Sequence, residues 1–145
     1  MKKLLFLLIL VLTLSCEKDS MDTEALGQNS GIIGTWVEQI DISLSAVDDG
    51  VTRLTRMEEL ADSGYGFTVN GDGSFIERKN AGWCGTPPIS YDNFEGTWVA
   101  LSDSLLDITV AYWGGKLTYQ MRIVTLEGDQ LGIRYLYAED RAKAK

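Results

Sequence analysis

The sequence contains no histidine among its 145 residues. Histidine is the commonest general base and the commonest metal ligand, so its absence excludes Ser-His-Asp and Cys-His catalytic sites and histidine-ligated zinc. The 21 acidic residues offer many carboxylate pairs, and no spacing among them singles out a pair suited to glycoside hydrolysis. We therefore expect no catalytic residue, no metal and no cofactor, and a protein that is not an enzyme.

Cysteine and basic residues are also scarce. Cys16 and Cys84 are the two cysteines, and if Cys16 carries a lipid, Cys84 has no partner for an intrachain disulfide. Lysine and arginine number 13 against 21 acidic residues, a net charge of −8 that disfavours nucleic acid as a partner. The fold is expected to rely on its core alone.

The chain has one long apolar run, which lies at its start. Two lysines precede the apolar stretch from Leu4 to Leu12, which is shorter than the roughly 20 residues that a transmembrane helix needs. This order of segments is typical of a secretory signal peptide. The residues Thr13-Leu14-Ser15-Cys16 resemble a lipobox, in which the cysteine is acylated and becomes the mature N-terminus. The sequence predicts a signal peptide over residues 1–15 and lipid attachment at Cys16.

The remaining chain divides into a linker and a domain. Residues 16–30 are polar and turn-rich without periodicity, which is typical of a flexible tether. Residues 31–145 suffice for one domain with a real core. Acyl chains on Cys16 make the membrane itself a partner, because each buried methylene contributes about 0.8 kcal/mol. We expect a lipid-anchored protein of the cell envelope, at the outer membrane, on its periplasmic or its surface-exposed face.

From residue 31 onward, apolar and polar residues alternate between turn markers, as in antiparallel β proteins. Tight turns such as Asn70-Gly71-Asp72-Gly73 join most of the predicted strands. These strands cover residues 32–44, 66–69, 74–79, 91–101, 105–113, 117–123 and 131–137. The pattern indicates an all-β fold, either an antiparallel up-and-down β-barrel of about seven to eight strands or a sandwich.

Residues 45–63 interrupt this alternation. Thr55 and Glu58 fit a capping box, and apolar residues recur at every third position, which slightly favours a short helix: Val51, Leu54, Met57 and Leu60. The alternative is an edge strand over residues 51–57.

Two Gly-Thr-Trp motifs, Gly34-Thr35-Trp36 and Gly96-Thr97-Trp98, lie on either side of a Gly-Asp-Gly-Ser-Phe hairpin. This arrangement, followed by hairpinned strands, resembles the lipocalin-like domains of short barrel lipoproteins from Gram-negative bacteria. In lipocalins the first tryptophan closes one end of the barrel, and an arginine from a late strand lies over its ring. The resemblance implies that Gly34 and Trp36 form this motif with Arg134 or Arg122.

The same resemblance has consequences for ligand binding. Residues 45–63 occupy the place of the first lipocalin loop, which partly covers the open end of the barrel, although a variable surface loop without a ligand is the favoured interpretation. A small hydrophobic molecule or a lipid is the implied ligand. The alternative function is an envelope-surface module that binds a glycan or a protein without a ligand inside the barrel.

An aromatic platform is one candidate binding surface. Trp83 lies in a stretch bent by glycines and stiffened by Pro87 and Pro88, and together with Tyr91 and Trp113 it offers flat rings to a sugar. A loop that packs Trp83 and Cys84 into the barrel end explains the same residues without a ligand.

Glu38 is the other candidate ligand contact. It shares the parity of Trp36, so it points inward, either toward a ligand or toward an arginine, unless a bulge after Trp36 turns it outward. Cys84 is not expected to act as a nucleophile, because the nearest cation in the sequence is Lys79 and no histidine is present.

Overall fold

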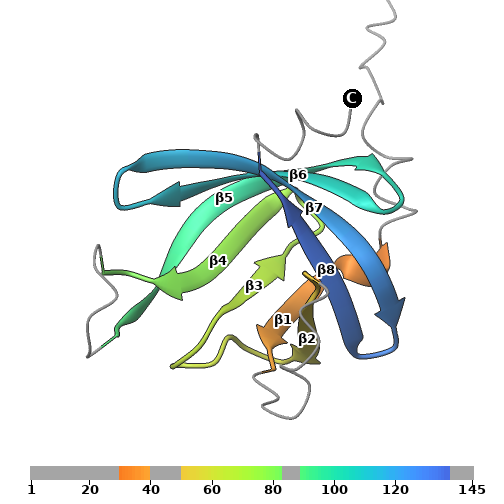
Figure 1. Ribbon diagram of the computed structural model, residues 1–145, viewed down its shortest axis with the longest axis horizontal. Helices are drawn as coiled ribbons and strands as arrows, with labels where there is room; N and C mark the ends of the chain where they lie inside the picture. The colour runs from red at the N-terminus through yellow and green to blue at the C-terminus, as the bar shows by residue number, and fades with distance from the viewer. Residues whose placement is uncertain (1–29, 40–49, 83–88, 138–145) are drawn as a thin grey trace, which may run out of the picture.

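Alternating inward and outward side chains produce a closed antiparallel β-barrel (Figure 1). The computed structural model describes residues 30–39, 50–82 and 89–137. A 3-10 helix, η1 (Ser30–Ile32), precedes eight strands: β1 (Gly34–Glu38), β2 (Thr52–Met57), β3 (Gly66–Val69), β4 (Ser74–Asn80), β5 (Tyr91–Ser102), β6 (Leu105–Tyr112), β7 (Gly115–Glu127) and β8 (Gln130–Leu136). The predicted all-β up-and-down barrel of seven to eight strands is confirmed.

The strand order is sequential from β3 to β8 and changes around β1, which pairs with both β2 and β3. The barrel closes where β2 pairs with β8. Met57 at the end of β2 pairs with Thr35, whereas Gly66 at the start of β3 pairs with Val37, further along β1. Residues 58–65 therefore carry the chain along the length of β1, from one end of the barrel to the other.

The two ends of the barrel differ in their connections. At one end lie η1 and the short turns between β3 and β4, β5 and β6, and β7 and β8. At the other end, here called the mouth, β1, β4, β6 and β8 end and β2, β3, β5 and β7 begin. The connections of β1 to β2, of β4 to β5 and of β6 to β7 thus leave from the mouth.

Buried apolar side chains fill the barrel interior from the end that carries η1. Each contributes about 1.5 to 3 kcal/mol on burial, so together they are the main source of stability. They comprise Ile32, Trp36, Leu54, Phe67, Val69, Phe75, Trp98, Leu106, Ile108, Val110, Tyr119, Met121, Leu131 and Ile133. Within the described ranges, no helix is long and apolar enough to cross a membrane.

The predicted helix within residues 45–63 is wrong for the part of the segment that the structure describes. Residues 52–57 form strand β2, in which Leu54 is buried and Met57 is 53% exposed, the alternation of a strand rather than a helical face. The strand is not at an edge, because β1 and β8 flank it on both sides. Pairing on two sides outweighs the weak local helical pattern. Residues 40–49, which include the last part of the predicted first strand, lie outside the described residues.

Trp36 closes the end opposite the mouth. Its side chain is fully buried, and its indole Nε1 donates a hydrogen bond to the Ile32 carbonyl at 2.7 Å. Ile32 is fully buried as well, so η1 lies across this end of the barrel with Trp36 beneath it. Trp98 on β5 has a similar role, since its Nε1 donates to the Asn70 carbonyl at 2.8 Å. The two Gly-Thr-Trp motifs thus place one indole each at the closed end.

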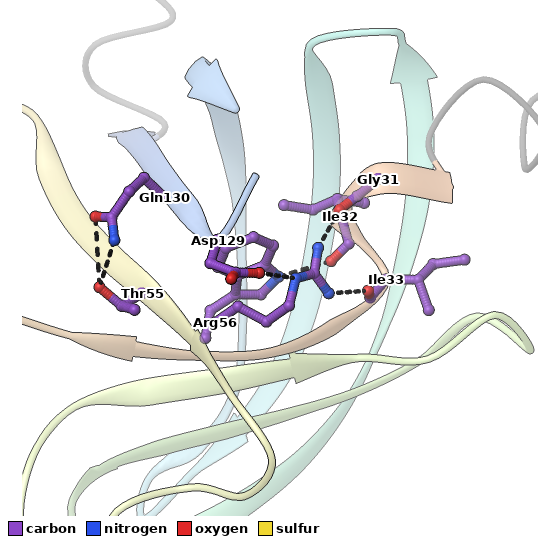
Figure 2. A network of polar contacts seen from close by, with 8 residues as sticks. Gly31, Ile32, Ile33, Thr55, Arg56, Asp129 and Gln130 are labelled. Atoms are coloured by element: carbon purple, nitrogen blue, oxygen red, sulfur yellow. Dashed lines mark hydrogen bonds and ion pairs between the residues drawn. The ribbon is translucent and has the colours of Figure 1, made fainter. Parts of the chain in front are cut away.

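Arg56 holds η1 over the closed end (Figure 2). Its guanidinium carbon lies 4.2 Å from the centroid of the Trp36 ring, a cation-π contact. Its Nη2 donates to the Gly31 carbonyl at 2.7 Å and its Nη1 to the Ile33 carbonyl at 2.8 Å. Its Nε lies 3.6 Å from a carboxylate oxygen of Asp129 in the β7–β8 turn. One side chain thereby joins η1, β1, β2 and the turn that follows β7.

Gly34 leaves the space that Arg56 occupies. A Cβ at position 34 would lie 2.3 Å from Nη1 of Arg56, and the φ of Gly34 is +137°, a value that favours glycine. Glycine at this position is thus favoured by its backbone conformation, and a side chain here would also displace the arginine that covers the tryptophan.

The expected partner of Trp36 was wrong. Arg56 of β2 lies over the ring, whereas Arg134 and Arg122 are exposed on β8 and β7. Both of these arginines alternate with inward apolar residues such as Ile133 and Met121, so their side chains leave the barrel on its outer face. Arg56 has the parity of buried Leu54 and reaches the closed end from within.

We predict that Arg56→Ala lowers the free energy of unfolding by about 2 to 4 kcal/mol, because it removes the cation-π contact and two charge-assisted hydrogen bonds. Arg56→Lys should recover less than half of this loss, since an ammonium cannot both lie over the ring and bridge two carbonyls. Urea unfolding followed by tryptophan fluorescence measures both changes. Arg122→Ala, on an exposed side chain, is the control, and an equal loss in this variant would contradict the prediction.

Candidate functional site

A cavity of about 350 Å³ opens at the mouth, above the apolar core. The lining side chains come from six strands or the residues next to them. On each strand they follow the buried inward-facing residues, one or two alternate positions closer to the mouth. Below the cavity these inward-facing residues are apolar, as in Phe75 before Glu77 and Met121 after Tyr119. The lining residues are Glu38, Thr52, Tyr65, Glu77, Lys79, Leu117, Tyr119, Tyr135 and Tyr137.

Glu77 is the buried carboxylate in the lining of this cavity and is only 5% exposed. Its Oε1 accepts hydrogen bonds from the hydroxyls of Tyr65 at 3.0 Å and Tyr119 at 3.1 Å. Its Oε2 lies 2.6 Å from Nζ of Lys79, two residues further along β4. A buried carboxylate costs several kcal/mol unless it is paired, and these three donors satisfy that requirement.

A second hydrogen bond extends the network to β8. The hydroxyl of Tyr65 lies within hydrogen-bond distance of the hydroxyl of Tyr135. A phenol carries a single hydrogen, and that of Tyr65 is donated to Glu77, so Tyr135 is the donor in this second bond. Two tyrosine hydroxyls thus donate to the Glu77 carboxylate and a third donates to one of these two, and the three rings form walls around the carboxylate.

The tyrosine rings contact one another as well as Glu77. Tyr135 lies edge-on to Tyr65 at 6.3 Å and to Tyr119 at 5.5 Å between ring centroids. Tyr137 stacks on Tyr135 at 6.2 Å and lies 5.9 Å from Tyr119. Such aromatic pairs add about 0.5 to 1.5 kcal/mol beyond the area that they bury. The lining is therefore held by packing before any ligand enters.

Burial determines the protonation of these groups. It raises the pKa of Tyr65 and of Tyr135 well above the ordinary value, and the nearby Glu77 carboxylate adds to the rise. The pKa of Tyr119 is raised by the same causes, burial first. Burial also raises the pKa of the Glu38 carboxyl. All three hydroxyls bonded in this network therefore keep their protons at neutral pH and act as donors.

Of the residues expected to bind a ligand, Glu38 lines the cavity, at the end of β1. Tyr91 at the start of β5 and Trp113 after β6 do not; Trp113 is 60% exposed and packs edge-on against Tyr112. Trp83, Cys84 and Cys16 lie outside the described residues, so the predicted aromatic platform and lipid attachment stay predictions. Lys79 enters the site as the ion-pair partner of Glu77.

Sequence reasoning missed Glu77 and the tyrosines around it. The signal for Glu77 was present, because it alternates with Phe75 in a predicted strand and so falls on the inward side. Tyr119 and Tyr135 alternate with the buried Met121 and Ile133, which is the pattern of apolar core residues. Nothing in the sequence marked their hydroxyls as partners of one carboxylate.

A second hollow, of about 320 Å³, lies on the outer face of β5, β6 and β7. Its walls are the outward side chains of these strands around Gly96, including Glu95, Thr109 and Lys116. None of its lining residues is buried, and Thr109 forms its hydrogen bond with Thr118 on the same face. The mouth cavity, with a buried polar network and aromatic walls, is the candidate functional site.

We predict that the protein becomes less stable as the pH rises above about 10, where tyrosines of the unfolded chain ionise. The folded state retains the protons of Tyr65, Tyr119 and Tyr135, because their pKa values are raised, so unfolding releases protons. Each tyrosine adds a slope of up to about 1.4 kcal/mol per pH unit. Urea unfolding across this pH range measures the total slope.

Tyr119→Phe separates this effect from lysine titration, since it removes one of the three tyrosines and should lessen the slope by that amount. Absorbance of tyrosinate provides an independent measurement, because these three residues should ionise only as the protein unfolds. Ionisation of all the tyrosines in the folded state, together with an unchanged slope in Tyr119→Phe, would refute the prediction.

Comparison of the chain with protein-family models, curated proteins and solved structures finds no match. The β-barrel thus rests on the strand pairing itself, in which every strand has a partner on both sides. The lipocalin-like family and the lipoprotein character, which follow from sequence motifs, stay predictions.

Proposed function

We propose that this domain binds a small organic molecule in the cavity at the barrel mouth. The observation that carries the proposal is the cavity itself, about 350 Å³ in volume and lined by four tyrosines and a Glu77–Lys79 ion pair. Sites for small molecules occupy about 300 to 1,000 Å³, combine aromatic walls with a few placed polar groups, and lie preferentially at the mouths of β-barrels. This lining has each of those properties.

The polar lining favours an amphipathic ligand over the purely hydrophobic molecule or lipid that the sequence resemblance implied. A long acyl chain needs an apolar tunnel, whereas the barrel interior below the cavity is occupied by side chains such as Phe67, Phe75 and Ile108. At the mouth, carboxylates and an ammonium group stand beside the rings. A ligand with both flat or compact apolar surface and polar groups matches these walls.

Binding is favoured over chemical conversion by the state of the polar groups. The hydroxyls of Tyr65, Tyr119 and Tyr135 are protonated and already hydrogen-bonded, so they do not act as bases at neutral pH. Glu77 accepts from three donors, which holds its carboxylate in place. Rigid, satisfied groups of this kind reduce the entropy lost when a ligand binds.

A sugar is the second candidate ligand. The stacked rings of Tyr135 and Tyr137, with centroids 6.2 Å apart, provide flat apolar surface beside the Glu38 carboxylate, which can accept hydrogen bonds from hydroxyl groups. A glycan would then bind in the mouth cavity and not at the predicted platform of Trp83, Tyr91 and Trp113.

We also propose that the domain acts at the outer membrane, anchored by acyl chains on Cys16. Support for this comes from the signal-peptide pattern and from the position of Ser30, the first described residue, which begins η1 at the closed end of the barrel. The predicted tether joins the barrel at this closed end, opposite the mouth. Such an attachment does not hold the mouth against the membrane, so a ligand can reach it from the aqueous phase.

We predict that Thr52→Trp abolishes binding of compounds selected from a mixed fragment library of neutral, charged and sugar-like molecules. Thr52 lines the cavity, so an indole at this position fills part of its volume. Ligand-observed NMR against the unmodified protein identifies the binding fragments, and the same measurement is repeated on the variant.

The matched control is Thr55→Trp, on the same strand but with its hydroxyl bonded to Gln130 on the outer face. Fragments should bind this variant as they bind the unmodified protein. Both variants should unfold cooperatively, which checks that the barrel is intact. Fragments that bind Thr52→Trp unchanged would place binding elsewhere and contradict the proposal.

Lipid attachment is tested by Cys16→Ala in a bacterial host. We predict that the unmodified protein partitions into the membrane fraction and incorporates labelled palmitate, because its acyl chains each bury many methylene groups. The variant lacks the acylated thiol and should lose both properties. Equal palmitate labelling of the variant, or recovery of the unmodified protein in the soluble fraction alone, would show the anchor assignment to be wrong.

A further inference from the structure

The cavity lining carries one negative charge that no described residue balances. Three of its side chains are charged, namely Glu38, Glu77 and Lys79. Glu77 and Lys79 form an ion pair at 2.6 Å, and Lys79 also lies over the ring of Phe94, with Nζ 5.1 Å from the centroid. The pair is neutral as a unit, and Glu38 is left as the excess charge.

Glu38 is held at the rim by its backbone, while its carboxylate has no partner within the described ranges. Its backbone N–H donates to the Tyr65 carbonyl at 2.9 Å, which fixes the end of β1 beside the tyrosines. The carboxylate makes no hydrogen bond or ion pair with the other described residues, and partial burial raises its pKa. A positive group beside the carboxylate would offset the cost of burying its charge.

The tyrosines surround this charge with ring surface. Tyr65 and Tyr135 direct their hydroxyls into the hydrogen-bond network with Glu77 and are half-buried, so part of each ring remains to contact a ligand, whereas Tyr119 is only 2% exposed and supports them from the core. Tyr137 extends the wall to the rim, where it is 47% exposed. The face of an aromatic ring carries negative potential and attracts cations within about 6 Å of its centroid. Rings and carboxylate thus favour the same sign of charge.

From this arrangement we infer that the ligand carries a cationic ammonium group, which lies against the tyrosine rings with Glu38 as its counter-ion. The inference rests on the proposed binding function and adds the chemical class of the ligand. An anion would meet the Glu38 carboxylate and the ring faces with the wrong sign, while the ammonium of Lys79 is already bound to Glu77. A neutral sugar would leave the charge of Glu38 unbalanced.

The test compares choline with its neutral isostere, in which a carbon atom replaces the quaternary nitrogen. Both compounds have the same shape and the same hydroxyl group, so a difference in affinity reports the charge alone. Titrations are followed by chemical-shift changes of the tyrosine ring protons in the unmodified protein. We expect choline to bind at least about tenfold more tightly than the isostere.

Variants of Glu38 and Tyr137 test whether these two side chains cause the preference for choline. Glu38→Gln should weaken choline about tenfold and leave the isostere unchanged. Glu95→Gln, the same change on the outer face, should alter neither affinity. Tyr137→Leu should weaken choline, whereas Tyr137→Phe should retain its affinity, because the ring and not the hydroxyl makes the contact.

Two results would overturn the inference. One is that choline binds no better than its isostere, or does not bind at all; the other is that Glu38→Gln leaves choline affinity unchanged. If library fragments bind the unmodified protein and lose this binding in Thr52→Trp, the cavity is a binding site for another chemical class and only the charge assignment fails. If no fragment responds to Thr52→Trp, the proposed function fails with it.

Discussion

The contact between the Arg56 guanidinium and the Trp36 ring closes one end of the barrel and thereby determines at which end a cavity can open. It occurs where β1 and β2 pair at the closed end, and the same guanidinium binds two carbonyls of the chain entering β1. Because Asp129 also contacts Arg56, the first, second and last strands are joined at one point. A barrel closed in this way is sealed at one end, so its accessible interior lies at the other.

The inward side of the barrel changes from apolar to polar along its length, and Glu77 marks the change. One step deeper on β4 the inward residue is Phe75, which stacks on Phe67, and one step further out it is Lys79. A carboxylate at this level needs donors from several directions, which tyrosines supply without adding charge. The result is a layer of hydrogen-bonded rings that covers the core and forms the floor and walls of the cavity.

Much of this fold was predictable, since alternation and turn chemistry are local properties. The strands over residues 66–69, 74–79 and 105–113 agree with β3, β4 and β6 to within a residue or two. The error over residues 45–63 arose because β2 is a strand for a non-local reason, its pairing with β1 and β8. The arginine over Trp36 was misassigned for a related reason: its identity depends on which strand becomes the neighbour of β1.

The site was less predictable than the fold, because its parts come together only when the barrel closes. Parity alone shows that Glu77 points inward, as it shows for Glu38. The two tyrosines that donate to Glu77 are 12 and 42 residues away in the sequence, on opposite sides of it, and no spacing links them. The sequence therefore shows that an inward carboxylate needs hydrogen-bond partners, but only the pairing of the strands shows which residues they are. The Glu38 carboxylate has the same requirement at the rim, where no described residue pairs with it, and it is therefore the group that we propose pairs with a ligand.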